Sequence, residues 1–478
     1  MNKILTYQVP TGIPIIEDYI VKVREAGGEW KIIQTYKVKV DMHKVREASM
    51  TYFDFNGQVE CEIVCLKVDP TEVTIRPQSK GIKGQIKGKS IFFILKDPMN
   101  LSIEVNGDRF HNLHLFAGEI LEKNLDLSSP KVLMLKGDKD SIIEHSMEEI
   151  TQKLNELGED AILYFGPGAH NMKEKKCYLP SDVKVYIDGG AVVMGSFILS
   201  RCQNVVIEGR GVIYLADVEK TTYLRGVELE YAKNVKVEGV TIINPAHYSI
   251  LMGSSEKIIV DGVKTFSCEG WSDGFDMMGC RHVRIQNSFL RNSDDCIAIY
   301  GQRGEFVGDT YDIQVVDTVL WADVAHPINI GTHGDSEKEG NIISDLLFSN
   351  LDILEHHEPQ DDYLGCMSIN PGDKNTVRDV VFDRIRIEQF ERGKLLDLQV
   401  KYNKRYNPAP GNKIENITFS NISYNGEGEF PSHINGYDET RTVENIKFIN
   451  FKINGQHILS PEEGQIVIGE HAYNITFE

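Results

Sequence analysis

Three features are scarce or missing in this sequence of 478 residues, and each absence excludes a class of protein. No stretch approaches 18 consecutive apolar residues, which excludes a membrane-spanning helix. Lys and Arg number 51 against 71 Asp and Glu, and the net charge of −20 argues against nucleic acid or an anionic membrane as a partner. The first eight residues lack the apolar core of a signal peptide, so we predict a cytoplasmic protein, or a secreted one if a leader has been removed.

The cysteines never form a C-x-x-C pair, which removes the usual signature of a zinc ribbon or a redox motif. Most of them lie inside apolar runs, where a thiol behaves as a small hydrophobic group. Buried free thiols are therefore predicted, with disulfides or a zinc site as the alternative. The eight are Cys61, Cys65, Cys177, Cys202, Cys268, Cys280, Cys296 and Cys366.

What the sequence does contain is a repeat. Its pattern is Asn or Asp, apolar, any, apolar, any, then Gly or Asn and an apolar residue, and successive copies start 23 to 37 residues apart. Each copy indicates a short β-branched strand closed by a turn residue, and one such strand cannot bury its apolar face alone. Clear copies start at Asn204, Asn234, Lys257, His282, Asp312, Asp345, Asp379, Asn416 and Asn445.

Stacked turns of this length would bury a continuous core, which predicts an all-β chain with a right-handed parallel β-helix over residues 131–478. A β-sandwich array is disfavoured because its strands recur at shorter spacing. Residues 1–130 instead carry strand-like runs separated by polar turns, typical of a small antiparallel β-sandwich. Between the two, Ser146 and Glu149 form an S-x-x-E capping box that predicts a helix plugging the open end of the solenoid.

Two consecutive repeats carry carboxylates that the strand pattern does not require. The segment EGWSDGFDM contains Asp273 and Asp276, and RNSDDCIAIYG contains Asp294 and Asp295. Adjacent side chains on a strand point to opposite faces, so the last two must occupy a turn if both face solvent. Because 21 residues separate Asp273 from Asp294, about one coil, the two turns should be stacked neighbours.

One coil further on, the segment DVAHPINIGTHG brings His326 and His333 to the same flank. Crowded carboxylates raise one another's proton affinity, so one can stay protonated as a general acid while another acts as a base. Hydrolysis of a glycosidic bond needs that combination, an acid for the leaving oxygen and a base for water. The pattern therefore favours a glycosidase site.

In order along the chain, the blocks SDGFDM, NSDDCIAI and AHPINIG resemble the signature blocks of glycoside hydrolase family 28, the polygalacturonases and rhamnogalacturonases. The inverting relatives of family 49, the dextranases and isopullulanases, share the β-helix. The resemblance covers roughly residues 160–460, and residues 1–130 look more like the N-terminal sandwich of family 49.

Carried over to this sequence, the resemblance implies that Asp294 is the general acid and that Asp273 and Asp295 activate the attacking water. It makes His326 the histidine that tunes the acid, and it places Tyr402 near the substrate. Inversion requires room for that water, about 6.5–9.5 Å between the carboxyl groups.

The basic segment that binds the uronate carboxylate in pectin-acting members corresponds to Ser368-Ile369-Asn370, with no charge and with Asn370 as the candidate sugar contact. Without a cation there, the favoured substrate is a neutral sugar such as an α-glucan, unless Lys401 or Arg405 substitutes. Trp271 is a candidate for stacking on a pyranose ring, and His247 and Tyr248 are further candidates for substrate contacts.

The resulting expectation is an inverting glycoside hydrolase of α-glycosidic bonds, leaning to a neutral sugar and to attack from one chain end. The alternatives are a polygalacturonase-type hydrolase of pectic galacturonides, a calcium-dependent lyase of the pectate type, and a non-catalytic sugar-binding β-helix. No cofactor or metal is expected, since the acidic loop of residues 356–362 reads as a solvated surface. The expected partner is a carbohydrate, and a homo-oligomer is compatible with the exposed flanks of a solenoid.

Overall fold

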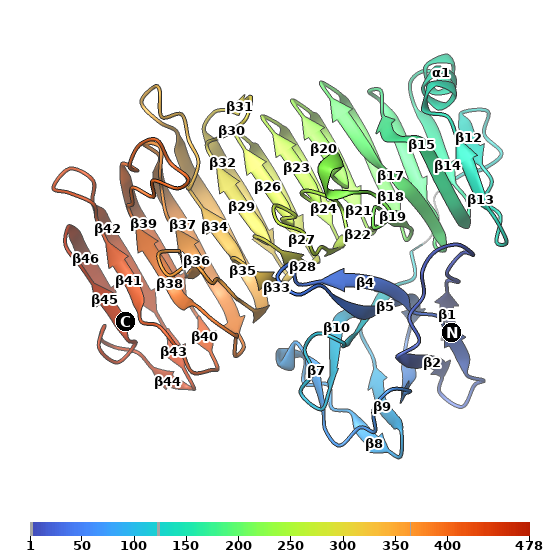
Figure 1. Ribbon diagram of the computed structural model, residues 1–478, viewed down its shortest axis with the longest axis horizontal. Helices are drawn as coiled ribbons and strands as arrows, with labels where there is room; N and C mark the ends of the chain where they lie inside the picture. The colour runs from blue at the N-terminus through green and yellow to red at the C-terminus, as the bar shows by residue number, and fades with distance from the viewer. Residues whose placement is uncertain (1–2, 122–124, 364) are drawn as a thin grey trace.

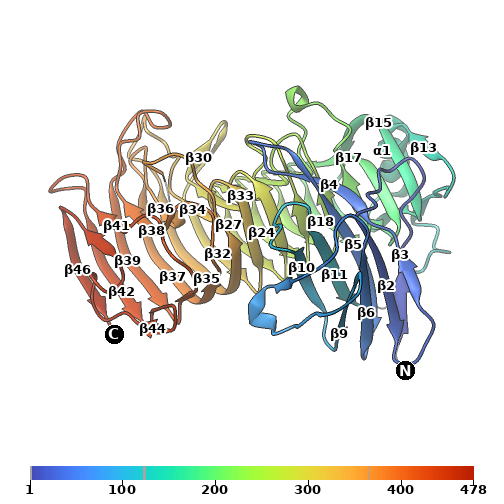
Figure 2. The same cartoon turned by 60° about the horizontal axis from the view of Figure 1, so that its bottom comes forward.

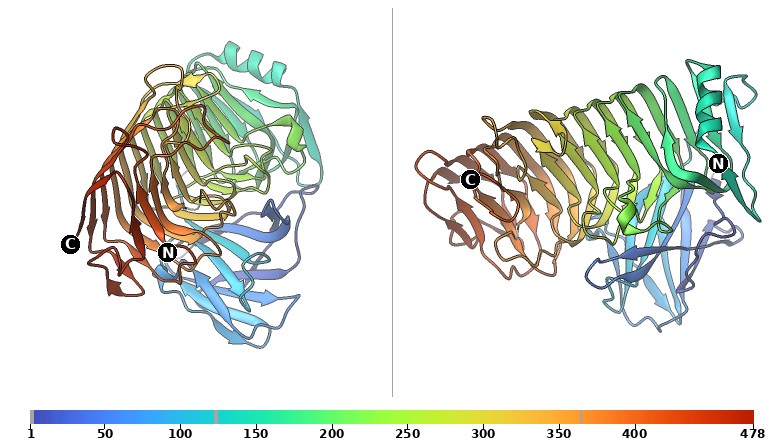
Figure 3. Two further views of the ribbon diagram at one scale, coloured as in Figure 1. Left: turned by 60° about the vertical axis from the view of Figure 1, so that its left-hand side comes forward. Right: turned by 45° about the horizontal axis from the view of Figure 1, so that its top comes forward.

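The computed structural model describes residues 3–121, 125–363 and 365–478. The protein is all-β, with an N-terminal β-sandwich followed by a right-handed parallel β-helix, as the sequence predicts. Figure 1 shows the sandwich against the N-terminal and middle coils of the solenoid, while the C-terminal coils extend beyond it. The turned views in Figures 2 and 3 show the same arrangement. No helix in the described ranges is long and apolar enough to cross a membrane.

The sandwich consists of two sheets whose apolar faces enclose one core. All strand pairs in it are antiparallel except β5 with β11. The first sheet contains β1 (Lys3–Thr6), β4 (Tyr36–Val40), β5 (Arg46–Asn56), β7 (Val73–Arg76), β10 (Met99–Val105) and β11 (Leu113–Glu119). The second contains β2 (Tyr19–Glu25), β3 (Lys31–Ile33), β6 (Val59–Cys65), β8 (Gln85–Lys87) and β9 (Ser90–Leu95), and a short helix η1 (Gln78–Lys80) follows β7.

The solenoid is built from three parallel ladders, each of which takes one strand from most coils. The first runs through β12 (Val132–Leu135), β14 (Ala161–Phe165), β16 (Val183–Ile187), β18 (Gln203–Gly209), β21 (Lys233–Glu238), β24 (Glu256–Asp261), β27 (Arg281–Gln286), β32 (Thr310–Val316), β35 (Ile342–Glu355), β37 (Thr376–Ile387), β39 (Lys413–Ser420), β42 (Val443–Ile449) and β46 (Ala472–Phe477). The second runs through β13 (Ile142–His145), β15 (Gly168–Tyr178), β17 (Ala191–Ser200), β19 (Val212–Tyr214), β22 (Thr241–Ile243), β25 (Lys264–Phe266), β28 (Phe289–Ser293) and β33 (Val319–Val324) to β35, and from β37 to β40 (Ser423–Tyr424) and β43 (Lys452–Ile453).

The third ladder forms the face that carries the acidic residues. It runs from β17 through β20 (Val227–Glu230), β23 (Ile250–Gly253), β26 (Phe275–Met278), β29 (Ile297–Tyr300), β34 (Ile328–Ile330), β36 (Gly365–Ile369), β38 (Lys394–Gln399) and β41 (Ser432–Asn435) to β45 (Ile466–Ile468). Outside the ladders lie a hairpin of β30 (Gln302–Arg303) and β31 (Phe306–Val307), a short β44 (Gln456–His457) and a short helix η2 (Lys220–Thr222).

The polar residue that opens each repeat has a structural explanation. All nine of these residues adopt a left-handed backbone, with φ between +54° and +59°. Asn and Asp tolerate that conformation better than other side chains, which accounts for their preference at this position. Where two coils both carry Asn, the side chains also bond along the stack: the amide of Asn234 donates to Asn204 at 2.7 Å, and that of Asn445 donates to Asn416 at 3.1 Å.

The predicted helix is present as α1 (Met147–Leu157), with Ser146 at its N-cap. The capping box itself is wrong, because the Ser146 side chain makes no capping hydrogen bond. The N–H of Met147 donates instead to the carboxylate of Glu174, at 3.1 Å. The apolar face of α1 buries Ile150 and Leu154 against β14 and β15. The thiol prediction is confirmed, since all eight cysteines are buried and free.

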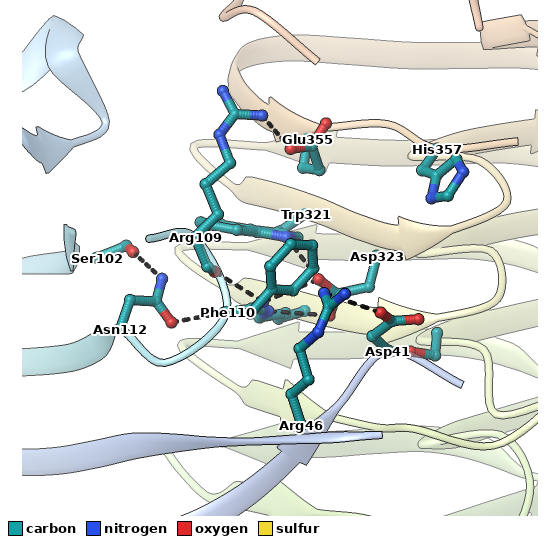
Figure 4. A network of polar contacts seen from close by, with 12 residues as sticks. Asp41, Arg46, Ser102, Arg109, Phe110, Asn112, Trp321, Asp323, Glu355 and His357 are labelled. Carbon is teal, nitrogen blue, oxygen red and sulfur yellow. Dashed lines mark hydrogen bonds and ion pairs between the residues drawn. The ribbon is translucent and has the colours of Figure 1, made fainter. Parts of the chain in front are cut away.

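The sandwich and the solenoid meet at a buried group of charged residues that we call the interface cluster. The guanidinium of Arg291 on β28 pairs with Asp323 on β33 at 2.8 Å, with both side chains fully buried. Arg76, from the sandwich, bonds Glu104 at 2.9 Å and Glu388 at 2.7 Å. Figure 4 shows the ion pair between Arg109 and Glu355 and the neighbouring Asp323. The cluster consists of Arg76, Arg109 and Arg291 with Glu104, Asp323, Glu355 and Glu388.

Candidate active site

The two acidic turns stack one coil apart, in agreement with their spacing of 21 residues. Ser272 and Ser293 form an isolated bridge between the turns. In the next coil, the N–H of Cys296 donates to the carbonyl of His326 at 2.8 Å. Three successive coils therefore bring their polar turns to one patch of the surface.

The backbone at this patch is strained. Asp294 has a φ of +138°, and Trp271 and Ala325 in the neighbouring coils have φ of +60° and +67°. A non-glycine residue in such a conformation costs about 1–3 kcal/mol and persists where the surrounding structure over-determines it. The strain at Asp294 lets two consecutive carboxylates leave the strand on the same side, which an extended strand would prevent.

Asp295 is held as an anion by a protonated histidine. Its Oδ1 accepts from Nδ1 of His326 at 2.6 Å, while Nε2 of the same ring faces the carbonyl of Tyr363 at 2.8 Å. Both ring nitrogens therefore face acceptors, and only the imidazolium can donate to both. Oδ2 of Asp295 accepts from the amide of Asn329 at 2.7 Å. Burial alone would raise the pKa of Asp295, but the His326 charge and these hydrogen bonds lower it; the same contacts raise the pKa of His326 to about 9 against the effect of its own burial.

Asp294 has the opposite electrostatics. Burial and the charge of Asp295 raise its pKa to about 7, although the N–H of Trp271 donates to its Oδ2 at 2.8 Å. A carboxyl with a pKa near neutrality retains its proton at mildly acidic pH and can deliver it to a leaving oxygen. Neighbouring carboxyls with opposite shifts are the pattern expected of an acid and a base.

Asp273 and Asp276 complete what we call the carboxyl cluster, together with Asp294 and Asp295. Asp273 is 5% exposed and Asp276 is fully buried, and burial together with the neighbouring carboxylates raises the pKa of each well above its usual value. Oδ1 of Asp273 and both oxygens of Asp276 have no hydrogen-bond partner among the described residues. One oxygen from each of Asp273, Asp294 and Asp295 lies within 4.8 Å of the other two.

The carboxyl cluster opens into a cavity of about 330 Å³. Of the residues singled out from the sequence as catalytic or substrate-binding, six line it: Tyr248, Trp271, Asp273, Asp294, Asp295 and Arg405. His326 lies behind Asp295 and is fully buried. The ring of His247 is 4.1 Å from that of Tyr248, at the edge of the same group.

The remaining substrate candidates lie elsewhere. Asn370 is buried, its amide donates to the carbonyls of Ile369 and Asp397, and it does not line the cavity. Lys401 already pairs with Asp397 at 2.8 Å. Tyr402 donates to the carbonyl of Pro408 at 3.1 Å, and both Lys401 and Tyr402 line a neighbouring pocket.

Several cavity residues carry no local sequence signal. Met42 and His43 come from the turn between β4 and β5 of the sandwich, and the N–H of Met42 donates to the hydroxyl of Ser293 at 3.1 Å. Arg303 comes from the β30–β31 hairpin and donates to Nε2 of His333 at 2.8 Å. His333, which the sequence placed on this flank, also lines the cavity.

The family model for glycosyl hydrolases family 28 matches residues 201–463, more than half of the chain. A probable endopolygalacturonase D of Neosartorya fischeri is 27% identical over 201 residues, which are 41% of this chain and 36% of that protein. A polygalacturonase of Fusarium fujikuroi is 25% identical over 208 residues, 40% of this chain and 51% of that protein. The chain therefore spans about half or less of the length of these relatives.

Among solved structures, Dex49A from Penicillium minioluteum superimposes with a TM-score of 0.67 at 14% identity, covering 99% of this chain and 96% of that one. The family 28 exopolygalacturonase of Yersinia enterocolitica gives a TM-score of 0.54 at 12% identity, covering 88% of this chain and 96% of that one. At these identities the likeness shows the fold, including the β-helix, and nothing finer.

Proposed function

This chain belongs to the glycosyl hydrolases of family 28, and on that premise we propose that it hydrolyses the glycosidic bonds of pectic galacturonides. The observation that supports this substrate is a pair of arginines, Arg303 and Arg405, that line the cavity beside the carboxyl cluster. Neither has a carboxylate within 4 Å among the residues that the structure describes. Arg303 donates to His333 and Arg405 donates to Gln360, both neutral side chains. The charge of each guanidinium is therefore available for the carboxylate of a uronic acid.

The expectation of a neutral sugar depended on the missing charge at Ser368-Ile369-Asn370. In the structure these three residues are buried and do not line the cavity, so their neutrality says nothing about the sugar. The cations come instead from an inserted hairpin and from a loop beyond β38. The pectic alternative is therefore the better hypothesis.

In the proposed reaction Asp294 protonates the oxygen of the leaving sugar, as its raised pKa allows. A water bound between Asp273 and Asp295 attacks the anomeric carbon, and an ionised carboxylate of the pair accepts its proton. His326 keeps Asp295 ionised while Asp294 stays protonated. Each group thus begins the cycle in the protonation state that its environment favours.

We further propose that the attack is a single displacement that inverts the anomeric centre. Both oxygens of Asp295 already accept hydrogen bonds, so this carboxylate is a poor covalent nucleophile. The 4.8 Å limit between nearest oxygens argues the other way, because inverting sites usually separate the carboxyl groups by about 6.5–9.5 Å. The proposal of inversion therefore depends on the hydrogen bonding of Asp295, and the anomer of the first product decides it.

Attack from a chain end is part of the proposal, because added segments wall the cavity. Met42 and His43 close one side from the sandwich, and Glu358, Gln360 and Tyr363 close another from the loop after β35. We expect these walls to hinder a long polymer from binding across the carboxyl cluster. Short galacturonides with a free end would not be hindered.

The test is release of reducing sugar from polygalacturonate and its oligomers, against dextran, pullulan and galacto-oligosaccharides. We expect activity on galacturonides with mono- or disaccharide as the first product, and at least a hundredfold loss in Asp294→Asn. Proton NMR of the first turnover should show the inverted anomer. Cleavage of the neutral sugars alone would refute the substrate, a ladder of intermediate products would refute chain-end action, and a retained anomer would refute inversion.

A further inference from the structure

Two large aromatic rings lie exposed side by side at the edge of the cavity. The side chains of Tyr223 and Trp271 are 48% and 54% exposed, and their rings stack with centroids 6.3 Å apart and planes 26° apart. They come from different coils, 48 positions apart in the sequence. Aromatic faces pack well against the apolar faces of ligands, so two rings exposed together at the edge of a cavity are a candidate binding surface. We call this pair the aromatic platform.

Both residues of the aromatic platform are held in strained backbone. The φ of Tyr223 is +50° and that of Trp271 is +60°, a region that costs a non-glycine residue about 1–2 kcal/mol. The strain at Trp271 accompanies the hydrogen bond from its N–H to Asp294. Tyr223 has no such bond to the carboxyl cluster, yet it ends η2 in a conformation that leaves its ring exposed. That conformation caps η2, because the N–H of Tyr223 donates to the carbonyl of Lys220 at 3.1 Å.

A lysine lies beside the aromatic platform with donor capacity to spare. The ammonium of Lys220 is 5.5 Å from the centre of the Trp271 ring and donates to the carbonyls of Ala246 and Gly270. An ammonium has three N–H groups, so one remains after these two bonds. Lys220 has no carboxylate partner within 4 Å in the described part of the chain. A cation beside two exposed rings matches a sugar that has an apolar face and a carboxylate.

We propose that the aromatic platform is a second sugar subsite, on which Tyr223 and Trp271 stack against the apolar face of a galacturonate ring while Lys220 binds its carboxylate. The subsite is continuous with the cavity, because Trp271 lines both. It lies on the side of the earlier coils, whereas Arg405 lies on the side of the later ones. This inference rests on the proposed function for the identity of the sugar, and it adds where the next sugar of the chain binds.

The test compares substrates of increasing length in variants of one ring. The Tyr223→Ala variant should leave kcat/KM for digalacturonate unchanged and lower it for trigalacturonate or tetragalacturonate by about threefold to tenfold, the range expected for loss of one aromatic contact. Tyr223→Phe keeps the ring and should restore the longer substrates. Tyr473, 49% exposed on β46 at the far end of the solenoid, provides the matched control Tyr473→Ala, which should change nothing.

Binding without turnover separates this inference from the proposed function. In an Asp294→Asn background, trigalacturonate should bind more weakly after Lys220→Met, while a methyl-esterified trimer should be insensitive to that change. Equal affinity for the trimer with and without the Tyr223 ring would overturn the subsite while leaving the hydrolase intact. Failure of any galacturonide to bind to the Asp294→Asn protein would overturn the proposed substrate itself.

Discussion

The interface cluster and the carboxyl cluster both bury ionisable side chains, but they differ in whether each carboxyl group has a cationic partner. At the interface every carboxylate faces a guanidinium, as in the bidentate pair of Arg291 with Asp323 at 2.8 and 2.9 Å. In the carboxyl cluster, Asp295 alone has a cationic partner, His326, while Asp273 and Asp276 keep oxygens without any partner in the described structure. The two clusters are joined by β28, since Arg291 lies three positions before Asp294.

The interface cluster uses buried charge for structure, whereas the carboxyl cluster uses it for chemistry. Pairing offsets desolvation only in part, since burial raises the pKa of Glu355 to about 7 even beside Arg109 and Arg76. An interface of this kind fixes how two domains dock without adding much stability. Carboxylates buried without cations, in contrast, destabilise the fold, and they persist where raised proton affinity is useful.

The same substitution, Asp to Asn, should have different effects in the two clusters. Asp294→Asn should reduce kcat by about 10²–10⁴ without lowering the free energy of unfolding, since an amide cannot deliver a proton. Asp323→Asn should instead lower the free energy of unfolding by about 3–5 kcal/mol, because it leaves the buried Arg291 without its counter-charge. Activity assays and urea denaturation on both variants provide the measurement.

The control for these two variants is an activity assay at a temperature where both are folded. Below its unfolding transition Asp323→Asn should retain most of the wild-type kcat, because Asp323 does not contact the cavity. The distinction between the two clusters would be wrong if Asp323→Asn had the wild-type free energy of unfolding, or if Asp294→Asn had a lower one.

The dependence of the free energy of unfolding on pH should reflect the raised pKa values in the carboxyl cluster. The folded pKa of Asp294, about 7, lies above its unfolded value of 3.8, so the folded state holds the extra proton and stability falls as pH rises between these values. His326 has a folded pKa of about 9, above its unfolded value of 6.5, so its contribution is complete below pH 6.5 and is lost as pH rises to 9, by roughly 3 kcal/mol. Urea denaturation at pH 5, 7 and 9 should therefore give steadily decreasing stability, and Asp294→Asn should make the decrease between pH 5 and pH 7 smaller.

Much of the fold follows from the sequence because it depends on a local pattern repeated many times. The repeat at Asn204 and its successors identifies each coil, since a left-handed turn residue and alternating apolar residues are required every time. The acidic turns were also predictable, because one coil separates Asp273 from Asp294 in both sequence and space. The failure at Ser146 was local as well: a distant carboxylate, Glu174, replaced the capping interaction that the motif normally makes.

The remainder of the site depends on contacts between distant segments. The N–H of Met42 donates to Ser293, which is 251 positions away in the sequence, and no sequence pattern near residue 42 predicts this contact. Arg303 lies on an inserted hairpin outside the repeat, where spacing gives no information about position. The assignment of Asn370 as a sugar contact came from alignment with a basic motif, which fixes order along the chain and not which side chains reach the cavity. Asn370 does not line the cavity.

A smaller effect is expected from neutralising the unpartnered carboxyl. Asp276→Asn should raise the free energy of unfolding at pH 7 by about 1–3 kcal/mol, because the wild-type residue must bury a group that ionises in the unfolded chain. The gain should vanish below about pH 3, where Asp276 is protonated in both states. Denaturation at the two pH values measures this, and a gain that is equal at both would mean that packing and not charge is responsible.

The smallest expected effect concerns Glu358. Like the carboxylates of the interface cluster it lies near a cation, His326, and like those of the carboxyl cluster it lies near another carboxyl group, Asp294. Its buried carboxylate is 3.9 Å from Nε2 of His326, and its charge raises the pKa of both His326 and Asp294. In Glu358→Gln the acid should therefore lose its proton at lower pH, so the alkaline limb of kcat/KM should move down by less than one pH unit. Glu391→Gln, at an exposed carboxylate paired with His357, is the matched control and should leave the profile in place. If both variants give the wild-type profile, the raised pKa of Asp294 comes from burial and from Asp295 alone. The loop that contains Glu358 would then make no contribution to that pKa.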